Sequence, residues 1–334
     1  MTTQSTMHAL VLDSFGTQLV HREIPRPSAG PGQVLVEVKA SGVNPLDTKI
    51  RAGSAAHAKP VLPAVLGIDL AGVVREVGTG VSGFKPGDEV YGMTGGVGGV
   101  QGSLAEYAAV DARLLAIKPS NLSMREAAAL PLVFITAWEG LVDRANVRAG
   151  QKVLIHGGAG GVGHVAIQIA KAFGAKVFAT EGPGKQELVE RLGATAINYS
   201  IESVETYVAK HTDGEGFDIV YDTVGGTTLD ASFEAVRRYQ GHVVSCLGWG
   251  THKLAPLSFR AATYSGVFTL LPLLTGEGRA HHGDIMREAT KLVEAGNLIP
   301  LLDPRSFTLV DAQAAHTAIE NRSAHGKIVV DIAE

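Results

Sequence analysis

A glycine-rich turn between a buried strand and a helix constrains the fold of this chain more than any other feature. Residues 153–155 (VLI) form the apolar, β-branched run that is typical of a fully buried strand. Residues 157–163 (GGAGGVG) form the turn, and residues 164–173 carry apolar side chains at helical spacing up to a cap at Gly174. Residues 176–180 (KVFAT) have the pattern of a second buried strand. The segment is therefore predicted to be a strand, a turn, a helix and a strand.

Three glycines of the turn have the spacing of a dinucleotide-binding motif. Gly158 is expected to form the tight turn, Gly160 to let the backbone approach a pyrophosphate, and Gly163 to let helix and strand pack closely. The helix begins near Gly161 and Val162, where free N–H groups and the helix dipole favour phosphate. The spacing alone is a weak signal in a chain with 41 glycines, but its place between a strand and a helix makes it specific. The alternative is a glycine-rich connection in an ordinary α/β protein.

Length, charge and cysteine content narrow the class of protein. The chain has 334 residues, enough for about two domains. Its net charge of −4 and the lack of a basic stripe argue against a nucleic-acid partner. Cys246 is the single cysteine, which excludes a disulfide within the chain and fits a reducing compartment. The first residues lack a signal-peptide pattern and the apolar run 270–274 is too short to span a bilayer, so we expect a cytoplasmic protein without a membrane partner.

The first third of the chain has the pattern of a β domain. Residues 34–40 alternate apolar and charged side chains, as a half-buried strand does, and short strands with frequent proline and glycine turns continue to residue 111. Residues 92–102 are too rich in glycine for a strand and are expected to form a mobile loop. At Ser123 a capping box with Glu126 begins a predicted helix that extends to about Leu141.

Strands and helices alternate from the glycine turn onward. Further strands are predicted at residues 194–199, 217–224, 241–247 and 266–270, and helices around 185–192, 204–211 and 228–239. The final residues, from 283 on, give two helices and strands near Phe307 and at 328–330. About six strands alternating with helices predict a doubly wound parallel sheet, which places the chain in the α/β class.

Several motifs in order resemble one protein family. They are GQVLVEVKASGVNPLDTKIRAG (32–53), LGIDLAGVV (66–74), KPGDEVYG (85–92), HGGAGGVG (156–163), RLGATAINY (191–199), FDIVYDTVGG (217–226) and HGKIVV (325–330). On these segments the chain resembles the medium-chain dehydrogenase/reductase superfamily, in its zinc-free quinone oxidoreductase (zeta-crystallin-like) branch. The resemblance implies a GroES-like β-barrel-type catalytic domain, 1–126 and 283–334, and a Rossmann domain, 127–282, that binds NAD(P).

The resemblance also bears on metal binding. The catalytic zinc ligands of the zinc-dependent members match Asn44, Ile68 and Leu132, and residues 92–102 stand where their four-cysteine lobe would lie. Apolar side chains cannot ligate an ion, and the histidines show no ligand spacing. We therefore expect no metal. Without a metal that polarises a carbonyl, a quinone or conjugated enone is the more credible acceptor, because it delocalises incoming charge itself.

The SGVNPLD turn supplies the catalytic candidates. By resemblance, Asn44 faces the nicotinamide and the substrate and orients or hydrogen-bonds one of them; its alternative role is an Asx turn before Pro45. Asp47 is expected to hold Arg51 or a backbone amide. Lys49 replaces the tyrosine that contacts substrate in many quinone reductases, and it could stabilise a developing oxyanion or be an ordinary surface lysine.

Further cofactor contacts follow from the resemblance. Thr136 matches a position that contacts the nicotinamide, with a hydroxyl bonded back to its own helix as the alternative. Cys246, Leu247 and Gly248 end a Rossmann strand, where ligands bind, and their backbone is expected to reach the nicotinamide amide. The Cys246 thiol is interpreted as inert packing. Lys327 is expected to contact the cofactor or to form a surface ion pair.

Cofactor choice depends on the end of the second Rossmann strand. Thr180 occupies the place where an acidic residue binds the ribose of NAD, and its hydroxyl cannot repel a phosphate. By resemblance, Lys185 and Tyr199 match positions that hold the adenosine phosphate of NADPH. Glu181 favours NADH instead, because a carboxylate repels the additional phosphate of NADPH. NADPH is the favoured cofactor.

The leading hypothesis is an NADPH-dependent oxidoreductase that transfers hydride to a small-molecule quinone or conjugated enone without a metal. The alternatives are a zinc-type alcohol dehydrogenase-like enzyme and a non-catalytic NADPH-binding protein, crystallin-like or RNA-associated. A homodimer is expected because residues 264–271 form an apolar run that would otherwise leave a sheet edge open. The sequence does not name the substrate or the proton donor.

Overall fold

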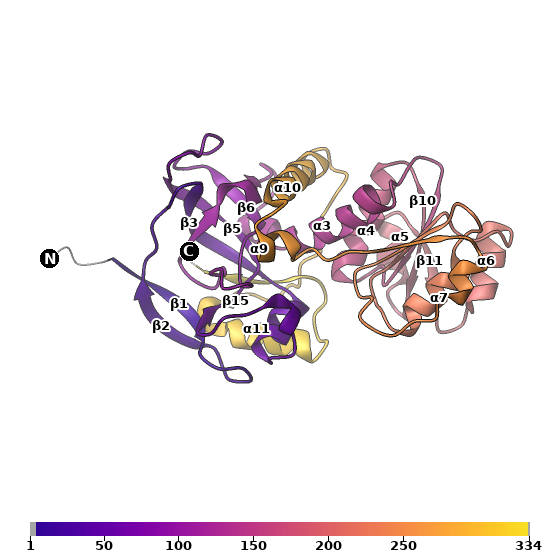
Figure 1. Ribbon diagram of the computed structural model, residues 1–334, viewed down its shortest axis with the longest axis horizontal. Coiled ribbons are helices and arrows are strands. Elements are labelled where there is room, and N and C mark those ends of the chain that lie inside the picture. Colours follow the sequence, from indigo (N-terminus) through magenta and orange to yellow (C-terminus); the bar gives the residue numbers. More distant parts are fainter. Residues whose placement is uncertain (1–4, 333–334) are drawn as a thin grey trace. The chain divides into compact units, whose positions relative to one another are not determined.

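The computed structural model describes residues 5–332, which divide into two compact units (Figure 1). Unit 1 is the described part of Met1–Leu132 and Leu270–Glu334, and unit 2 is Val133–Thr269. The domain boundaries at 126/127 and 282/283 stay a prediction, and residues 270–282 lie in unit 1. Arg279 bonds this segment to Asp111 of the same unit.

Unit 1 is built on two sheets whose strand pairs are antiparallel except for the parallel pair β15–β16, and the sequence predicted a β-rich domain here. One sheet has the order β2-β1-β4, and a larger one has the order β15-β16-β3-β5-β6-β8 with β7 paired to β3. The strands are β1 Thr6–Leu12, β2 Val20–Pro25, β3 Gln33–Val43, β4 Ala64–Val65, β5 Asp69–Val77, β6 Glu89–Met93, β7 Tyr107–Asp111, β8 Leu115–Ile117, β15 Phe307–Thr308 and β16 Ile328–Asp331. Its helices are α1 Pro45–Arg51, η1 Ala56–Ala58, η2 Ala112–Leu114, α2 Met124–Ala128, α9 Leu271–Thr275, α10 Arg279–Glu294, η4 Leu309–Asp311 and α11 Ala312–Glu320.

Unit 2 is the doubly wound parallel sheet that the sequence predicted. Its six strands have the order β11-β10-β9-β12-β13-β14, which is the Rossmann order, with helices flanking the sheet (Figure 1). The strands are β9 Lys152–His156, β10 Lys176–Glu181, β11 Thr195–Asn198, β12 Ile219–Asp222, β13 His242–Ser245 and β14 Thr263–Gly266. The helices are α4 Gly161–Ala172, α5 Gln186–Arg191, α6 Val204–Thr212, α7 Thr227–Ala235 and α8 Ala255–Ser258. Strand order reverses between β9 and β12, so the switch point lies beside the glycine turn.

The last predicted strand is displaced along the chain. The structure places β14 at Thr263–Gly266 rather than 266–270. Its four residues pair in register with His242–Ser245 of β13, and the Val267 N–H donates one further bond to the Ser245 carbonyl. The apolar residues that follow lead into α9, so they were misassigned as strand because a short apolar run suits either structure.

The predicted continuous helix from Ser123 to Leu141 is broken into three. The capping box is confirmed, since the Glu126 carboxylate accepts the Ser123 N–H at 2.8 Å. Helix α2 ends before Pro131, which has no N–H to continue it and instead begins α3 (Pro131–Trp138). A π-helix, η3 (Glu139–Arg144), follows α3 directly.

The glycine-rich segment 92–102 is packed against unit 1, whereas the sequence predicted a mobile loop. The Thr94 N–H donates to the Ile68 carbonyl at 2.8 Å, and the Gly102 N–H donates to the Val65 carbonyl at 2.9 Å. A Cβ at Gly102 would lie 2.3 Å from the Leu66 carbonyl oxygen. The glycines therefore serve close packing of backbone on backbone rather than mobility.

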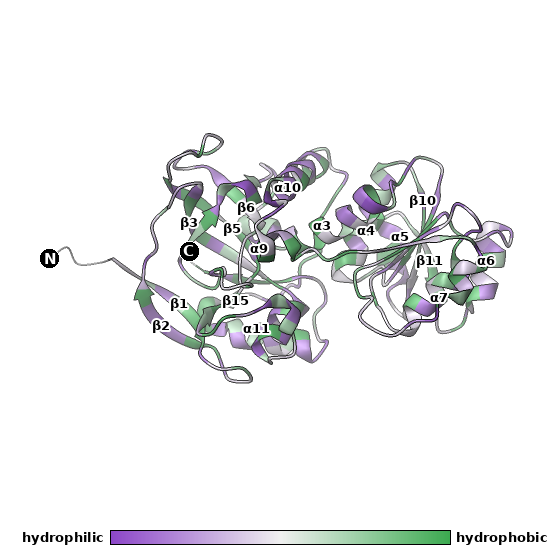
Figure 2. Ribbon diagram, in the orientation of Figure 1, coloured by the Kyte–Doolittle hydropathy of each residue, from purple (hydrophilic) through white to green (hydrophobic). Residues whose placement is uncertain are grey.

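Helix α10 covers part of the unit 1 sheet with one face. Its buried residues Ile285, Met286, Ala289 and Val293 recur at helical spacing, and the helix carries hydrophilic and hydrophobic residues together in Figure 2. The buried Tyr91 hydroxyl of β6 donates to the Met286 carbonyl at 2.9 Å. Across residues 5–332, every helix is too short or too polar to cross a bilayer.

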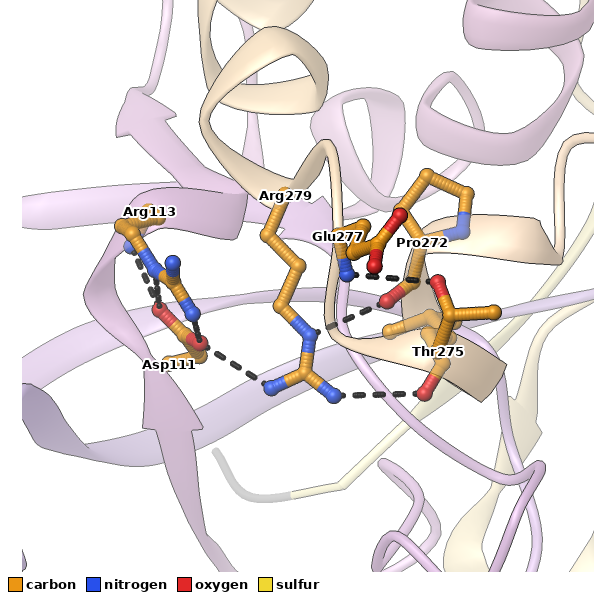
Figure 3. A network of polar contacts seen from close by, with 7 residues as sticks. Asp111, Arg113, Pro272, Thr275, Glu277 and Arg279 are labelled. Carbon is orange, nitrogen blue, oxygen red and sulfur yellow. Dashed lines mark hydrogen bonds and ion pairs between the residues drawn. The ribbon is translucent and has the colours of Figure 1, made fainter.

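Arg279 fixes the segment that enters α10 (Figure 3). Its guanidinium donates to the Asp111 carboxylate at 3.0 Å, to the Pro272 carbonyl at 3.1 Å and to the Leu273 carbonyl at 3.2 Å. Asp111 is also held by Arg113, and these two guanidinium groups lower the pKa of its carboxyl to about 2 although its burial opposes this. The network joins α9 and α10 to β7 and η2 within unit 1.

Replacing Arg279 by Gln should lower the free energy of unfolding by about 1–3 kcal/mol, because one charge-assisted bond and two bonds to carbonyls are lost. Arg287→Gln is the matched control on the same helix, since its pair with Asp284 is exposed and should contribute under about 1 kcal/mol. Denaturant unfolding of both variants measures the difference. Equal losses would contradict an anchoring role for Arg279.

Candidate active site and cofactor site

The glycine turn of unit 2 is built by close backbone contacts. Gly157 has φ 74°, so it, rather than Gly158, adopts the left-handed conformation of the turn. A Cβ at Gly158 would lie 2.7 Å from the Cβ atom of Ala179, and one at Gly163 would lie 2.0 Å from the Gly157 carbonyl oxygen. Side chains are therefore excluded at both positions by packing.

The turn leaves the N-terminus of α4 suited to a phosphate. Gly160 is the N-cap, and Gly161 and Val162 are the first helical residues. The N–H groups of a helix's first turn have no partner within the helix, and the helix dipole is positive there. With a Gly at the cap, a pyrophosphate can approach the backbone, so this turn fits the phosphates of a dinucleotide.

The last two residues of β10, Thr180 and Glu181, point their side chains at different partners. The Thr180 hydroxyl is buried and lies 2.8 Å from Nδ1 of His156, its partner on the neighbouring strand β9. The Glu181 carboxylate instead accepts the Ala159 N–H of the glycine turn at 2.7 Å and the Gly182 N–H at 3.1 Å. Glu181 thus contacts the turn with its side chain, whereas Thr180 contacts it with its carbonyl oxygen, which accepts the Gly157 and Gly158 N–H groups at 3.1 Å. The sequence placed both residues at the strand end but could not assign their directions.

Lys185 and Tyr199 are exposed residues that follow β10 and β11. Lys185 is the N-cap residue of α5 and is exposed. Tyr199 follows β11, and its hydroxyl would lie 3.2 Å from a Cβ placed at Gly182. A cation and a phenol hydroxyl are thus present on the segments that follow β10 and β11.

A buried imidazole lies under the turn. Burial lowers the pKa of His156 to about 4, although Asp222 opposes the shift, so the ring is neutral near pH 7. The Asp222 carboxylate accepts the Gly225 N–H at 2.9 Å and the Ser245 hydroxyl at 2.7 Å. These residues end β9 and β12, the two strands at the switch point, and they hold the following loops in place.

Of the predicted nicotinamide contacts in unit 2, Cys246, Leu247 and Gly248 follow β13, and Thr136 lies on α3 beside Thr269. The Thr136 hydroxyl is 3.0 Å from that of Thr269. The Leu247 N–H donates to the Ser245 hydroxyl at 3.0 Å, and a Cβ at Gly248 would lie 2.4 Å from the Tyr264 hydroxyl oxygen. Burial, and then Asp222, raise the pKa of the Cys246 thiol to about 12, so it stays protonated and is a poor nucleophile.

Unit 1 contains a buried group of charged and polar side chains, Asn44, Asp47, Asp69 and Lys327, which we name the Asn44 cluster. The Asn44 amide nitrogen donates to Asp69 at 2.8 Å, and its oxygen accepts from the Lys327 ammonium. Lys327 also donates to the Val43 carbonyl at 3.2 Å and lies 4.0 Å from Asp69. Asn44 and Asp69 are 0% exposed. Asn44 therefore bridges a carboxylate and an ammonium.

Burial sets the electrostatics of the Asn44 cluster. It raises the pKa of Asp47 to about 7 and that of Asp69 to about 6, in the second case against the attraction of Lys327. It lowers the pKa of Lys327, against the attraction of both carboxylates. The pKa values of the two carboxyls therefore lie near neutral pH, because both acids and the lysine are buried together in a medium of low dielectric constant.

The structure brings some predicted residues together and leaves others apart. Asn44 and Lys327 are in contact, whereas Lys49 is exposed on α1. Asp47 accepts the Asn44 N–H at 2.8 Å, which confirms the backbone-amide alternative, while Arg51 pairs with Glu320 at 2.6 Å. The sequence analysis missed Asp69, although an acidic residue at the start of an apolar strand is a recognisable signal of a buried partner.

Two of the positions that match zinc ligands are apolar and have structural roles. Ile68 is fully buried, and the Leu132 N–H donates to the Asp69 carboxylate at 2.8 Å. Among residues 5–332, no group of three or more His, Cys, Asp or Glu side chains is placed to hold a metal ion.

The Asp47 pKa gives a pH-dependent stability. Its folded-state pKa of about 7 lies above the ordinary value of 3.8, so this contribution is complete below about pH 4 and is lost as the pH rises through 7. Between about pH 6.5 and 8.5 the free energy of unfolding should fall by about 1 kcal/mol from this group. The pKa values of His156 and His316, both lowered to about 4, affect stability mainly at lower pH, where they make it rise with pH.

Asp47→Asn should flatten this decline, because the amide oxygen can still accept the Asn44 N–H but cannot ionise. Denaturant unfolding across the same pH range measures it, with exposed Asp13→Asn as the control that should keep the wild-type slope. An unchanged slope in Asp47→Asn would show that this carboxyl does not titrate there.

Comparisons with known proteins agree with this architecture. A family described as "Alcohol dehydrogenase GroES-like domain" matches residues 30–120, and one described as "Zinc-binding dehydrogenase" matches residues 192–330. The solved structure of an alcohol dehydrogenase superfamily protein from Novosphingobium aromaticivorans is 60% identical with a TM-score of 0.96, covering 98% of this chain and 100% of that chain. A quinone oxidoreductase from Coxiella burnetii is 30% identical with a TM-score of 0.82, covering 98% and 100%.

Two plant enzymes are similar over most of the chain. A 2-methylene-furan-3-one reductase of Solanum lycopersicum is 39% identical over 312 residues, which is 91% of this chain and 73% of that protein. An NADPH-dependent alkenal/one oxidoreductase, chloroplastic, of Arabidopsis thaliana is 38% identical over the same shares. With a GroES-like domain, a Rossmann domain and oxidoreductases of enones, alkenals and quinones as relatives, this chain belongs to the medium-chain dehydrogenase/reductase superfamily.

Proposed function

We propose that this protein reduces conjugated enones or quinones with NADPH and without a catalytic metal. The observation that carries the proposal is the combination of a glycine turn suited to a dinucleotide with apolar side chains, Ile68 and Leu132, at two positions that match zinc ligands. The two plant relatives are named for reduction of a methylene-furanone and of alkenals or alkenones, which supports the enone as acceptor.

The chemistry of a conjugated acceptor suits such a site. NADPH supplies the hydride. Hydride addition to the β-carbon of an enone forms a C–H bond, and the π electrons move to the carbonyl oxygen, so that the negative charge is spread over the enolate. A proton from water or from a protein acid then completes the saturated ketone. The protein therefore has to place the acceptor and stabilise the developing charge, and a polarising metal is not needed.

The Asn44 cluster is proposed to support this reaction indirectly. Both ends of the Asn44 amide are occupied, by Asp69 and Lys327, and the side chain is buried. Asn44 therefore suits a role in which it holds the backbone of the SGVNPLD turn and the Lys327 ammonium in position. Lys49 remains a candidate proton donor, because it is exposed on α1.

We propose NADPH as the preferred cofactor because the Glu181 charge is partly satisfied. Its carboxylate is bonded to two backbone N–H groups, which lessens its repulsion of a phosphate at the ribose. Lys185 and Tyr199 on the neighbouring loops could then bind that phosphate. The relative named as NADPH-dependent supports this choice.

A homodimer through β14 is also proposed. This edge strand is partly exposed, and the nearby Phe259 and Tyr239 side chains are 83% and 81% exposed. Edge strands with unpaired N–H and C=O groups are common sites of pairing between subunits. Light scattering at micromolar concentration tests this, and a monomeric mass would contradict it.

NADPH should bind more tightly than NADH, and Lys185→Ala should weaken NADPH binding by about threefold to tenfold while leaving NADH unchanged, because an exposed lysine contributes a screened contact to the phosphate. Glu181→Gln should favour NADPH further, since it keeps an acceptor for the Ala159 N–H and removes the charge. Fluorescence titration of each variant with both cofactors measures the ratio.

Lys210→Ala is the matched control, an exposed lysine of unit 2 that pairs with Glu202. It should leave both affinities unchanged. A wild type that prefers NADH, with Glu181→Gln reversing the preference, would show that Glu181 selects the unphosphorylated ribose.

The reaction itself should show a clear substrate pattern. NADPH should be consumed with quinones or conjugated enones. Ethanol should not be oxidised with or without added zinc, because an unactivated alcohol needs a polarising metal or a positioned general base to take its proton. Asn44→Ala should lower kcat more than it raises the Kd of NADPH. Asn121→Ala is the control in unit 1, because the Asn121 amide also donates a hydrogen bond, to the Val293 carbonyl at 3.1 Å, and it should stay near wild type. Zinc-dependent alcohol oxidation, or no turnover of any conjugated acceptor, would contradict the proposal.

A further inference from the structure

We propose that Tyr221 is a positioning residue for the nicotinamide half of the cofactor, acting through Thr136, which lies on α3 just before a π-helical turn. The inference rests on the proposed function. It concerns two residues, Tyr221 and Gly140, whose roles follow from their contacts in unit 2.

The topology of unit 2 decides which half of a dinucleotide each strand end meets. The pyrophosphate position lies at the turn after β9, and Glu181 lies on the β10–β11 side. In a doubly wound sheet the dinucleotide crosses the switch point, so its other half lies over the ends of β12, β13 and β14. Tyr221 is the residue before the last in β12, and Thr269 follows β14 by three residues. The pair of Thr136 and Thr269 hydroxyls therefore belongs to the nicotinamide side.

Tyr221 contacts Thr136 through the backbone. Its hydroxyl donates to the Thr136 carbonyl at 2.6 Å, and the ring is fully buried. A Cβ at Gly140 would lie 2.6 Å from Cζ and 2.8 Å from the hydroxyl oxygen of Tyr221. Glycine at this position is therefore what allows the phenol to lie against the helix and reach the carbonyl. Burial raises the pKa of Tyr221 well above its ordinary value, so the hydroxyl remains a donor at all working pH values.

The π-helix that follows Thr136 is the reason why this hydrogen bond can affect the direction of the Thr136 side chain. The Ala145 N–H donates to the Gly140 carbonyl, the five-residue spacing of a π turn, one turn after Thr136. A π turn holds one residue more than an α turn, and its reversion would rotate the preceding residues by roughly 100° relative to those that follow. The Thr136 hydroxyl would then turn away from Thr269. Tyr221 and Gly140 hold the helix in the register that keeps these two hydroxyls together.

A titration with two ligands tests this role. Tyr221→Phe keeps the ring and removes the hydrogen bond, so the Kd of NADP⁺ should rise by about threefold to tenfold. The Kd of 2′,5′-ADP, which lacks the nicotinamide half, should change by less than about twofold, because the phosphate and ribose contacts are untouched. Tyr207→Phe, a second buried tyrosine of unit 2 whose ring packs on Phe217, is the control and should change neither Kd.

A double-mutant cycle tests whether Tyr221 acts through Thr136. Thr136→Val should raise the Kd of NADP⁺. Adding Tyr221→Phe to it should have little further effect, because both changes remove the same feature, the Thr136 hydroxyl held beside that of Thr269. Gly140→Ala should reproduce the Tyr221→Phe pattern if the phenol is displaced. Additive effects in the cycle, or equal weakening of NADP⁺ and 2′,5′-ADP, would overturn the proposal. If the wild type binds neither ligand, the proposed function fails instead.

Discussion

The close approach of backbone to backbone at the glycine turn is the constraint on which the cofactor site depends. The Gly163 position lies so near the Gly157 carbonyl that any side chain would collide with it, and Gly158 is pressed against the strand bearing Ala179. This packing fixes where α4 begins, and so where its free N–H groups point. Once that point is set, the order of the six strands determines which loops flank each half of a bound dinucleotide.

The Asn44 cluster places a different constraint on unit 1. Burying two carboxyls and one ammonium is costly unless the charges are paired and hydrogen-bonded. The side-chain amide of Asn44 hydrogen-bonds both charges, since it donates to Asp69 and accepts from Lys327. The raised pKa values of Asp47 and Asp69 follow from this burial, and they couple the stability of unit 1 to pH near neutrality.

Much of this architecture could be predicted from the sequence, because it depends on local patterns. The glycine spacing, the capping box at Ser123 and the alternation of strands and helices each involve neighbouring residues, and the structure confirms them. The contacts of the site depend on residues far apart in the chain. Neither Glu181 turning towards Ala159 nor Lys327 meeting Asn44 follows from any local pattern. The break at η3 was missed for the same reason, since it depends on Tyr221 packing against Gly140.

In the proposed reaction, hydride reaches the β-carbon of a conjugated acceptor. Reduction of an enone with NADPH that carries deuterium at the hydride-donating carbon, followed by mass spectrometry and NMR of the product, tests this most directly. We expect a saturated ketone with one deuterium at the former β-carbon. Deuterium at the carbonyl carbon of an allylic alcohol, or a product without deuterium, would contradict it.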